Sequence, residues 1–171
     1  MVGIQTISIA IASAGVFAAA IYYIFELRHQ TKLRETDLMM RLYSIITDKE
    51  LQNDSLRVAH CEFEDYEDFV KRYGSLFDQK SEQELKFRQS FIQVLNMGEL
   101  LGSLLKKKLA GADFLYEFYS GVKLWEIAKP VVEGERRKHN DPRIFECFEY
   151  YYNEMKKREQ KLHQSRISGI L

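Results

Sequence analysis

The chain begins with an apolar run, residues 4–25, that contains no charged side chain. A helix of about 22 residues at about 1.5 Å per residue is about 33 Å long, enough to cross a hydrocarbon core about 30 Å thick. A cleaved signal peptide would instead have a basic start and a shorter apolar stretch. The pattern therefore predicts an uncleaved transmembrane anchor over residues 1–26.

Basic residues follow the predicted span, and none precedes it. Arg28, Lys32 and Arg34 lie directly after the apolar run. Because basic residues that flank a span favour the cytoplasmic side, we expect a single-pass protein of the cell membrane with its N-terminus outside and its C-terminal domain in the cytoplasm. The same three side chains are candidates for contact with the head groups of anionic membrane lipids.

Small and polar residues recur inside the span at spacings of three and four. This small-residue seam consists of Gln5, Ser8, Ala12, Gly15 and Ala19, and Tyr22 is the next position. Such spacings return to one face of a helix, with a drift of only about 20° per heptad. In lipid, small residues let helices approach closely, and polar side chains can bond across the contact. The seam therefore predicts a homo-oligomer, and a polar seam around a symmetry axis could line a pore.

Beyond the span, apolar positions keep a helical period and predict an all-α protein. The anchor is expected to continue as a juxtamembrane helix over residues 27–47, where Leu38, Leu42 and Ile46 would add an aqueous contact between copies. A cytosolic bundle of about four or five helices is expected over residues 48–164, followed by a flexible tail, residues 165–171. Its helices are predicted at about 47–58, within 62–74, and at about 81–109, 113–139 and 142–164.

Capping residues and breakers place the ends of these helices. The expected N-terminal capping boxes are Thr47 with Glu50 and Ser81 with Glu84, and the expected terminating glycines are Gly74 and Gly111. Gly98 and Gly102 are four residues apart in a long helix, which indicates a close helix crossing. Pro130 is expected to kink or divide its helix. Asp141 as N-cap and Pro142 as first residue would begin the last one.

Composition narrows the class of protein without naming an activity. The 171 residues are 46% hydrophobic and 29% charged, which is ordinary globular usage and excludes a collagen-like or fully disordered chain. Lys and Arg together number 25, as do Asp and Glu, so the net charge is zero and nucleic acid is not expected as a partner. The two cysteines lie far apart and exclude a disulfide scaffold.

Several short motifs carry a family resemblance. They are Leu124-Trp125-Glu126, Lys129-Pro130, Asn140-Asp141-Pro142-Arg143, Phe148-Glu149-Tyr150 and Tyr152-Asn153-Glu154-Met155. With them, the chain resembles an uncharacterised prokaryotic family of small single-span membrane proteins that carry a cytosolic helical domain. The resemblance implies the architecture expected above. It implies no activity, cofactor or catalytic residue.

A search for catalytic patterns finds one candidate pair. The chain has no C-x-x-C or H-E-x-x-H metal motif, no phosphate-binding glycine loop and no serine-hydrolase elbow, so no metal or cofactor is expected. Arg158 and His163 resemble the R-x4-6-H signature of small helical nuclease and nucleotide-binding domains in prokaryotic defence systems. There, Arg would hold a phosphate and His would act as acid and base.

One aromatic triplet is a candidate contact surface. Tyr150, Tyr151 and Tyr152 together cover about 200° of a helix, more than one small bundle readily buries. Either one of the three faces solvent without a role, or Tyr150 and Tyr151 face an unidentified protein partner. These features predict a non-enzymatic, membrane-anchored interaction and assembly module that self-associates through its span. The alternative is a membrane-anchored nuclease-like or pore-forming defence effector that uses Arg158 and His163.

Overall fold

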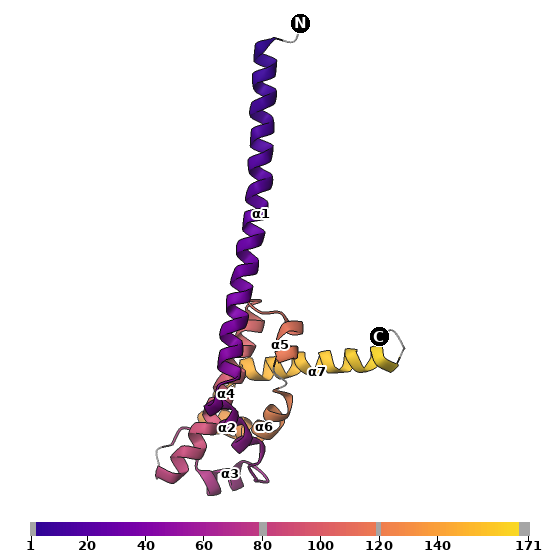
Figure 1. The fold of residues 1–171 in the computed structure, drawn as a ribbon. Helices are drawn as coiled ribbons and strands as arrows, with labels where there is room; N and C mark the ends of the chain where they lie inside the picture. The colour runs from indigo at the N-terminus through magenta and orange to yellow at the C-terminus, as the bar shows by residue number, and fades with distance from the viewer. Residues whose placement is uncertain (1–2, 79–81, 119–120, 168–171) are drawn as a thin grey trace. The chain divides into compact units, whose positions relative to one another are not determined.

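The computed structural model describes residues 3–78, 82–118 and 121–167, and for residues 4–8, 10, 82–84, 117, 118, 166 and 167 it describes the backbone alone. All regular structure in these residues is helical, which confirms the predicted all-α class (Figure 1). The helices are α1 (Ile4–Ile46), α2 (Lys49–Ala59), α3 (Tyr66–Tyr73), α4 (Glu82–Lys106), α5 (Ala112–Phe118), α6 (Val122–His139) and α7 (Glu146–Ile167). The chain divides into two compact units, Met1–Tyr43 and Ser44–Leu171.

The first unit contains α1 up to Tyr43, and α1 is a single helix of 43 residues that continues past the apolar run as predicted. Its part from Ile11 to Ile46 is the one helix in the described residues that is long and apolar enough to cross a membrane. No polar cap or glycine stops the helix where the apolar run ends. The charged residues that follow are good helix formers, so the same helix extends into a polar segment.

In the second unit, α2 and α3 begin at aspartate side chains. The Asp48 carboxylate accepts hydrogen bonds from the backbone N–H groups of Glu50 and Leu51, so the predicted Thr47 cap is wrong by one residue. Asp65 caps α3 in the same way. As predicted, α3 ends at Gly74, whose φ of 80° is the left-handed conformation that glycine adopts without steric cost.

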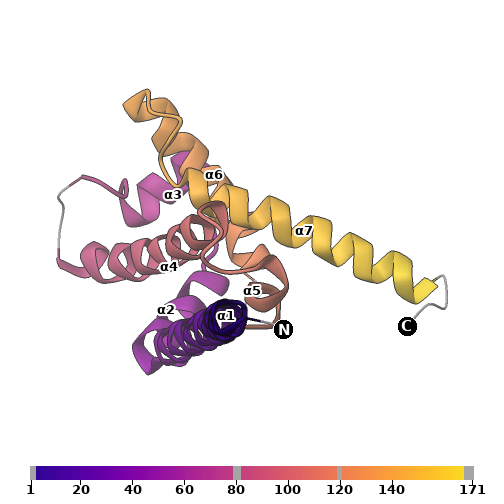
Figure 2. The ribbon, with the colours of Figure 1, turned by 90° about the horizontal axis from the view of Figure 1, so that it is seen from above.

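The centre of the domain is the crossing of α4 and α7 (Figure 2), and it confirms the prediction from the two glycines. A Cβ atom on Gly102 would lie 1.8 Å from the backbone oxygen of Cys147, and one on Gly98 would lie 2.3 Å from the Phe148 ring. Only glycine permits this approach of the two backbones. The largest side chains buried around the crossing and under α6 are Trp125, Tyr151, Phe69, Phe91 and Phe148.

The end of α4 differs from the prediction. The helix stops at Lys106, and Lys108 adopts the left-handed conformation with φ 56°, so Gly111 is not the terminating residue. The N–H of Leu109 donates to the carbonyl of Leu104 at 2.8 Å, and the N–H of Lys108 donates to that of Leu105 at 3.0 Å. This pair of bonds is a Schellman motif, which satisfies two carbonyls of the last turn.

The predicted helix over residues 113–139 is divided, but not at the proline. α5 ends at Phe118 and α6 begins at Val122 with Gly121 as its N-cap, whereas α6 continues through Pro130. Pro130 removes the hydrogen bond to the carbonyl of Glu126. Glu126 is exposed, so water can replace the missing donor. This division gives six helices after α1 in the described residues.

The last helix starts later than predicted. Asn140 ends α6 in the left-handed conformation, and the Asp141 carboxylate then binds the N–H and guanidinium of Arg143 in a turn. Asp141 and Pro142 therefore do not begin α7. The first turn of α7 is instead capped from α4, because the N–H of Phe148 donates to the Glu99 carboxylate at 2.9 Å. The Ser81–Glu84 capping box lies outside the described side chains.

Candidate functional site

The first half of α1 carries a long exposed apolar surface. Between Ile9 and Leu27, ten large apolar side chains are exposed: Ile9, Ile11, Val16, Phe17, Ile21, Tyr22, Tyr23, Ile24, Phe25 and Leu27. None of the most apolar part of the helix is buried by the rest of the chain. Isolated apolar residues are common on soluble proteins, but a contiguous patch of this kind marks contact with a membrane or another protein.

The small-residue seam lies on this exposed helix. Ala12, Gly15 and Ala19 are all exposed, and a Cβ atom added to Gly15 would meet nothing within 4 Å. The side chains of Gln5 and Ser8 lie outside the described part of the chain. No described segment of the same chain covers the three residues, so their surface is available to lipid or to another molecule.

Arg28, Lys32 and Arg34 are exposed on α1 directly after the apolar run. None of the three forms an ion pair with another described side chain, so each guanidinium or ammonium group is available to an external anion. Their contact with lipid head groups stays a prediction.

The tyrosine triplet is distributed differently from the expectation. Tyr151 is completely buried in the domain core and cannot meet a partner, so its assignment to a partner face is wrong. Tyr152 is half-buried, and its hydroxyl contacts the Glu126 carboxylate at 3.3 Å. Tyr150 alone is exposed, at 38%. The packing of α7 against α4 and α6 therefore covers two of the three tyrosines at least in part, which is more than we expected for a bundle of this size.

Arg158 and His163 are not brought together. The Arg158 guanidinium forms an ion pair at 2.5 Å with Asp113 at the start of α5. His163 is exposed and borders an open depression beside Tyr116 and Glu159. Five residues along a helix correspond to about 140° around its axis, so the two side chains leave α7 in different directions. This geometry gives the nuclease-like alternative no support.

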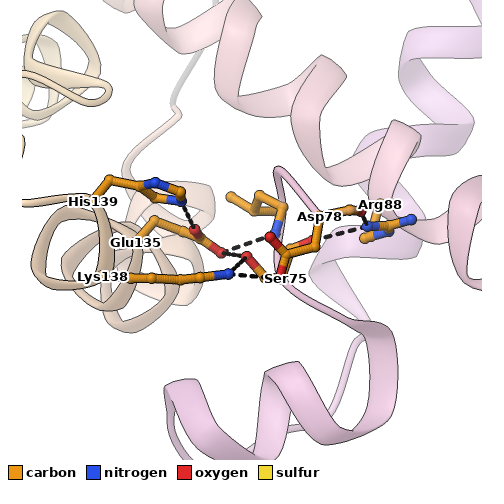
Figure 3. Close-up of polar contacts among 7 residues, drawn as sticks. Ser75, Asp78, Arg88, Glu135, Lys138 and His139 are labelled. Carbon is orange, nitrogen blue, oxygen red and sulfur yellow. Dashed lines mark hydrogen bonds and ion pairs between the residues drawn. The ribbon is translucent and has the colours of Figure 1, made fainter. Parts of the chain in front are cut away.

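A buried polar cluster, which the sequence reasoning missed, joins α6 to the loop after α3 (Figure 3). Its centre is Glu135, which has no exposed surface. One carboxylate oxygen accepts from the Ser75 hydroxyl and from the Leu76 N–H, both at 2.8 Å, and the other lies 3.2 Å from Nε2 of His139. A carboxylate without exposed surface is stable only with such donors around it.

Two cationic side chains complete this Glu135 cluster. Lys138 donates to the Ser75 hydroxyl at 2.9 Å and to the Asp78 carboxylate at 2.6 Å. The buried Arg88 of α4 donates to the backbone carbonyls of Ser75 and Asp78. The cluster therefore ties the loop that holds Ser75 to two helices.

Tyr66 lies against the Glu135 cluster. Its ring occupies the space that a side chain at Gly134 would need, since a Cβ there would lie 2.1 Å from the ring. Burial of the hydroxyl, with the negative charge of Glu135 as a second cause, raises the pKa of Tyr66. The tyrosine therefore stays neutral and does not add a second negative charge beside the buried carboxylate.

The Glu135 cluster stabilises the fold, and its geometry does not favour a catalytic role. A serine hydroxyl that donates a hydrogen bond to a carboxylate beside an ammonium group could become a nucleophile, but Ser75 is only 1% exposed. No substrate carbonyl or phosphate can approach it. The signal in the sequence was the spacing of Glu135 from Ala128 and Val132, which places an acidic residue on the buried face of α6.

Metal and thiol chemistry have little structural basis in the described part of the chain. No group of three or more His, Cys, Asp or Glu side chains there is arranged to hold a metal ion.

Burial raises the pKa of the Cys61 thiol to about 11, and the thiol donates to the Val58 carbonyl at 2.9 Å. A thiol with this pKa is almost entirely protonated at neutral pH and is a poor nucleophile.

Residues 9–155 match one protein family, described as Domain of unknown function (DUF4760). The chain belongs to this family. No curated protein and no solved structure matches the chain. The match begins in the apolar part of α1 and ends at Met155 in α7, so it includes the exposed apolar surface, the α4–α7 crossing and the Glu135 cluster. The family description states no activity, and function is therefore argued from the geometry of the chain.

Proposed function

We propose that this DUF4760 chain is a membrane-anchored interaction and assembly module, with α1 as its anchor and the domain of α2–α7 in the cytoplasm. The proposal rests on one observation, the ten exposed apolar side chains between Ile9 and Leu27. Leu, Ile, Phe and Val each favour insertion by about 0.3–0.6 kcal/mol at the centre of a span. Water would have to solvate the same surface at a cost, whereas a bilayer covers all sides of the helix at once.

The flanking residues support the orientation. Tyr22 and Tyr23 lie near one end of the apolar run, where tyrosine is enriched at a membrane interface. Arg28, Lys32 and Arg34 follow within about one to three turns and are exposed. Their charges favour the cytoplasmic leaflet, whose anionic lipids attract basic side chains. The N-terminus would then lie outside the cell.

Self-association through the small-residue seam is the second part of the proposal. Apolar side chains gain nothing by exchanging lipid contacts for contacts with each other, so helices associate in a bilayer where their backbones can pack closely. Gly15 and Ala19 permit that approach, and both are exposed. Assembly, rather than catalysis, is supported because the only catalytic pair that the sequence offers is separated on α7.

Extraction of native membranes tests the anchor. The wild-type chain should remain in the pellet after an alkaline carbonate wash and enter solution only with detergent. Phe17→Asp with Ile21→Asp should move the chain to the soluble fraction, because each aspartate costs about 3 kcal/mol near the centre of a span. Leu56→Asp with Leu109→Asp is the matched control, since both residues are exposed apolar side chains outside α1. A wild-type chain that dissolves in carbonate would overturn the proposed anchor.

A further inference from the structure

An exposed apolar stripe continues the small-residue seam into the polar half of α1. When the alternating spacing of four and three is extended from Ala19, it passes through Tyr22, Glu26, His29, Leu33, Thr36, Met40 and Tyr43 without a skip. Leu33, Met40 and Tyr43 are 56%, 69% and 56% exposed. They lie within about 80° of one another around the helix axis, so they form one surface. We call these three residues the apolar stripe.

The residues on the opposite side of α1 are less exposed than the apolar stripe. Leu42 is 3% exposed, and it lies about 180° around the helix from Leu33. Leu38 and Ile46 lie near Leu42 on the same side and are half-buried. The aqueous contact expected at these three residues stays a prediction. The apolar stripe is more exposed than they are and is the stronger candidate for a contact between copies.

We propose that the apolar stripe docks on the apolar stripe of a second copy of this chain, in a parallel coiled coil that continues the small-residue seam beyond the membrane. The proposal rests on the proposed function, because anchoring gives every copy the same orientation and so makes the pair parallel. Side chains that repeat strictly every seven residues drift slowly around a straight helix. A left-handed supercoil of two helices removes this drift, so the repeated side chains face the partner along the whole contact. The two parts of the seam then share one register.

Charge complementarity selects a second copy as the occupant. In a parallel coiled coil, the residue before one core position contacts the residue five places later on the partner helix. Here those residues are Lys32 and Asp37, which carry opposite charges and flank Leu33 and Thr36. Lys32 is exposed and has no ion pair with a described side chain. Asp37 pairs with Arg41 at 2.8 Å at the surface, where side chains rearrange at little cost.

Two polar residues interrupt the seam between the membrane and the apolar stripe. Glu26 accepts a hydrogen bond from Gln30 on its own helix at 3.0 Å, and His29 is exposed. Polar residues at core positions weaken a coiled coil but fix its register, because any other alignment leaves them against apolar partners. Glu26 and His29 therefore hold the small-residue seam and the apolar stripe in the same alignment.

Cysteine cross-linking of the full chain in isolated membranes tests the inference. The parent carries Cys61→Ser and Cys147→Ser, and single cysteines replace Leu33, Met40, Gly15 or Glu35. A disulfide forms only where Cα atoms come within about 7 Å of each other, which core positions of a coiled coil satisfy. Glu35 is the matched control, because it is exposed and lies about 160° around α1 from Leu33.

Under an added oxidant, we expect about fivefold or more covalent dimer at Leu33→Cys and Met40→Cys compared with Glu35→Cys. Dimer at Gly15→Cys without dimer at the apolar stripe would overturn the inference and leave the proposed membrane association intact. Dimer at all four positions would also overturn it, since random collision explains that pattern. Absence of dimer at every position would overturn both, whereas carbonate extraction reports on the anchor independently.

A charge exchange provides the second test. Lys32→Glu should weaken the detergent-solubilised dimer about threefold to tenfold, because it places like charges opposite each other at two symmetry-related sites. Adding Asp37→Lys should restore the dimer, although each single change weakens it. If the double change were as weak as the single ones, the proposed register of the coiled coil would be wrong.

Discussion

Two pairs of small residues four positions apart occur in different helices, and their surroundings are opposite. In α4, a Cβ on Gly102 would collide with the backbone of α7, and one on Gly98 would collide with the Phe148 ring. In α1, a Cβ on Gly15 would meet nothing, and Ala19 is exposed. The same spacing therefore marks a helix crossing that is complete within one chain in α4. In α1 no described part of the chain lies against the pair, and we propose a second copy as its partner.

The two regions also use apolar residues differently. In the domain, Phe91, Trp125 and Phe148 are almost or fully buried, whereas Phe17, Ile21 and Phe25 in α1 are mostly exposed. Burial of apolar surface holds the domain together within one chain. The apolar surface of α1 is exposed, and under the proposed function lipid or another copy covers it. Changes in the two regions should accordingly alter different observables.

The largest effect is expected from Gly102→Val. The added side chain would have to displace the backbone of Cys147, not a flexible side chain, so we expect a loss of about 3 kcal/mol in the free energy of unfolding. Thermal unfolding followed by circular dichroism measures this loss. Gly111→Val is the control, because nothing lies within 4 Å of a Cβ there. Equal stability of the two variants would contradict the close crossing of α4 and α7.

A smaller loss of stability is expected from Glu135→Ala. The change leaves the Ser75 hydroxyl and the Leu76 N–H without their buried acceptor, which should cost about 2–3 kcal/mol in the free energy of unfolding. Glu133→Ala, on the exposed side of α6, should cost less than about 0.5 kcal/mol. Denaturant titration distinguishes the two. If Glu135→Ala had the same free energy of unfolding as the wild type, the structural role of the Glu135 cluster would be excluded.

The counterpart of Gly102→Val in α1 should leave stability unchanged and alter assembly. Gly15→Ile with Ala19→Ile adds bulk to the small-residue seam without a clash inside the chain. We expect the mass of the detergent-solubilised protein to fall toward that of a monomer while helicity stays constant. An unchanged mass would exclude this seam as the interface. A monomeric wild type would exclude the oligomer itself.

Local spacing predicted more of this molecule than local capping did. The continuous α1, the close crossing at Gly98 and Gly102 and the end of α3 at Gly74 all follow from periodicity or from one residue's conformational freedom. The start of α7 does not, because its N-terminal cap is Glu99, a carboxylate 49 residues earlier in the chain. Such a cap depends on the tertiary crossing of α4 and α7, which no window of sequence contains.

The candidate sites show the same limit. Exposure of the apolar run in α1 could be predicted, because an uncharged run of about 22 residues is long enough to cross a membrane. The burial of Tyr151 and Glu135 could not be predicted from the sequence, because it depends on which faces of α6 and α7 pack against their neighbours. A helical period says that a stripe is buried but leaves its exact phase to the packing partner.

The smallest expected effect concerns where the two long helices stop. α1 runs for 43 residues without a left-handed residue, whereas the turn after the end of α4 at Lys106 holds Lys108 in a conformation that glycine adopts without strain. Lys108→Gly should therefore raise the free energy of unfolding by about 0.5 kcal/mol, since relief of the left-handed conformation outweighs the added freedom of the unfolded chain. Lys107→Gly, one residue earlier at φ below zero, should lower it by up to about 1 kcal/mol. The denaturant midpoints of the two variants measure this difference in stability. If both variants lost stability, Lys108 would stabilise the end of α4 through its side chain and not through its backbone conformation.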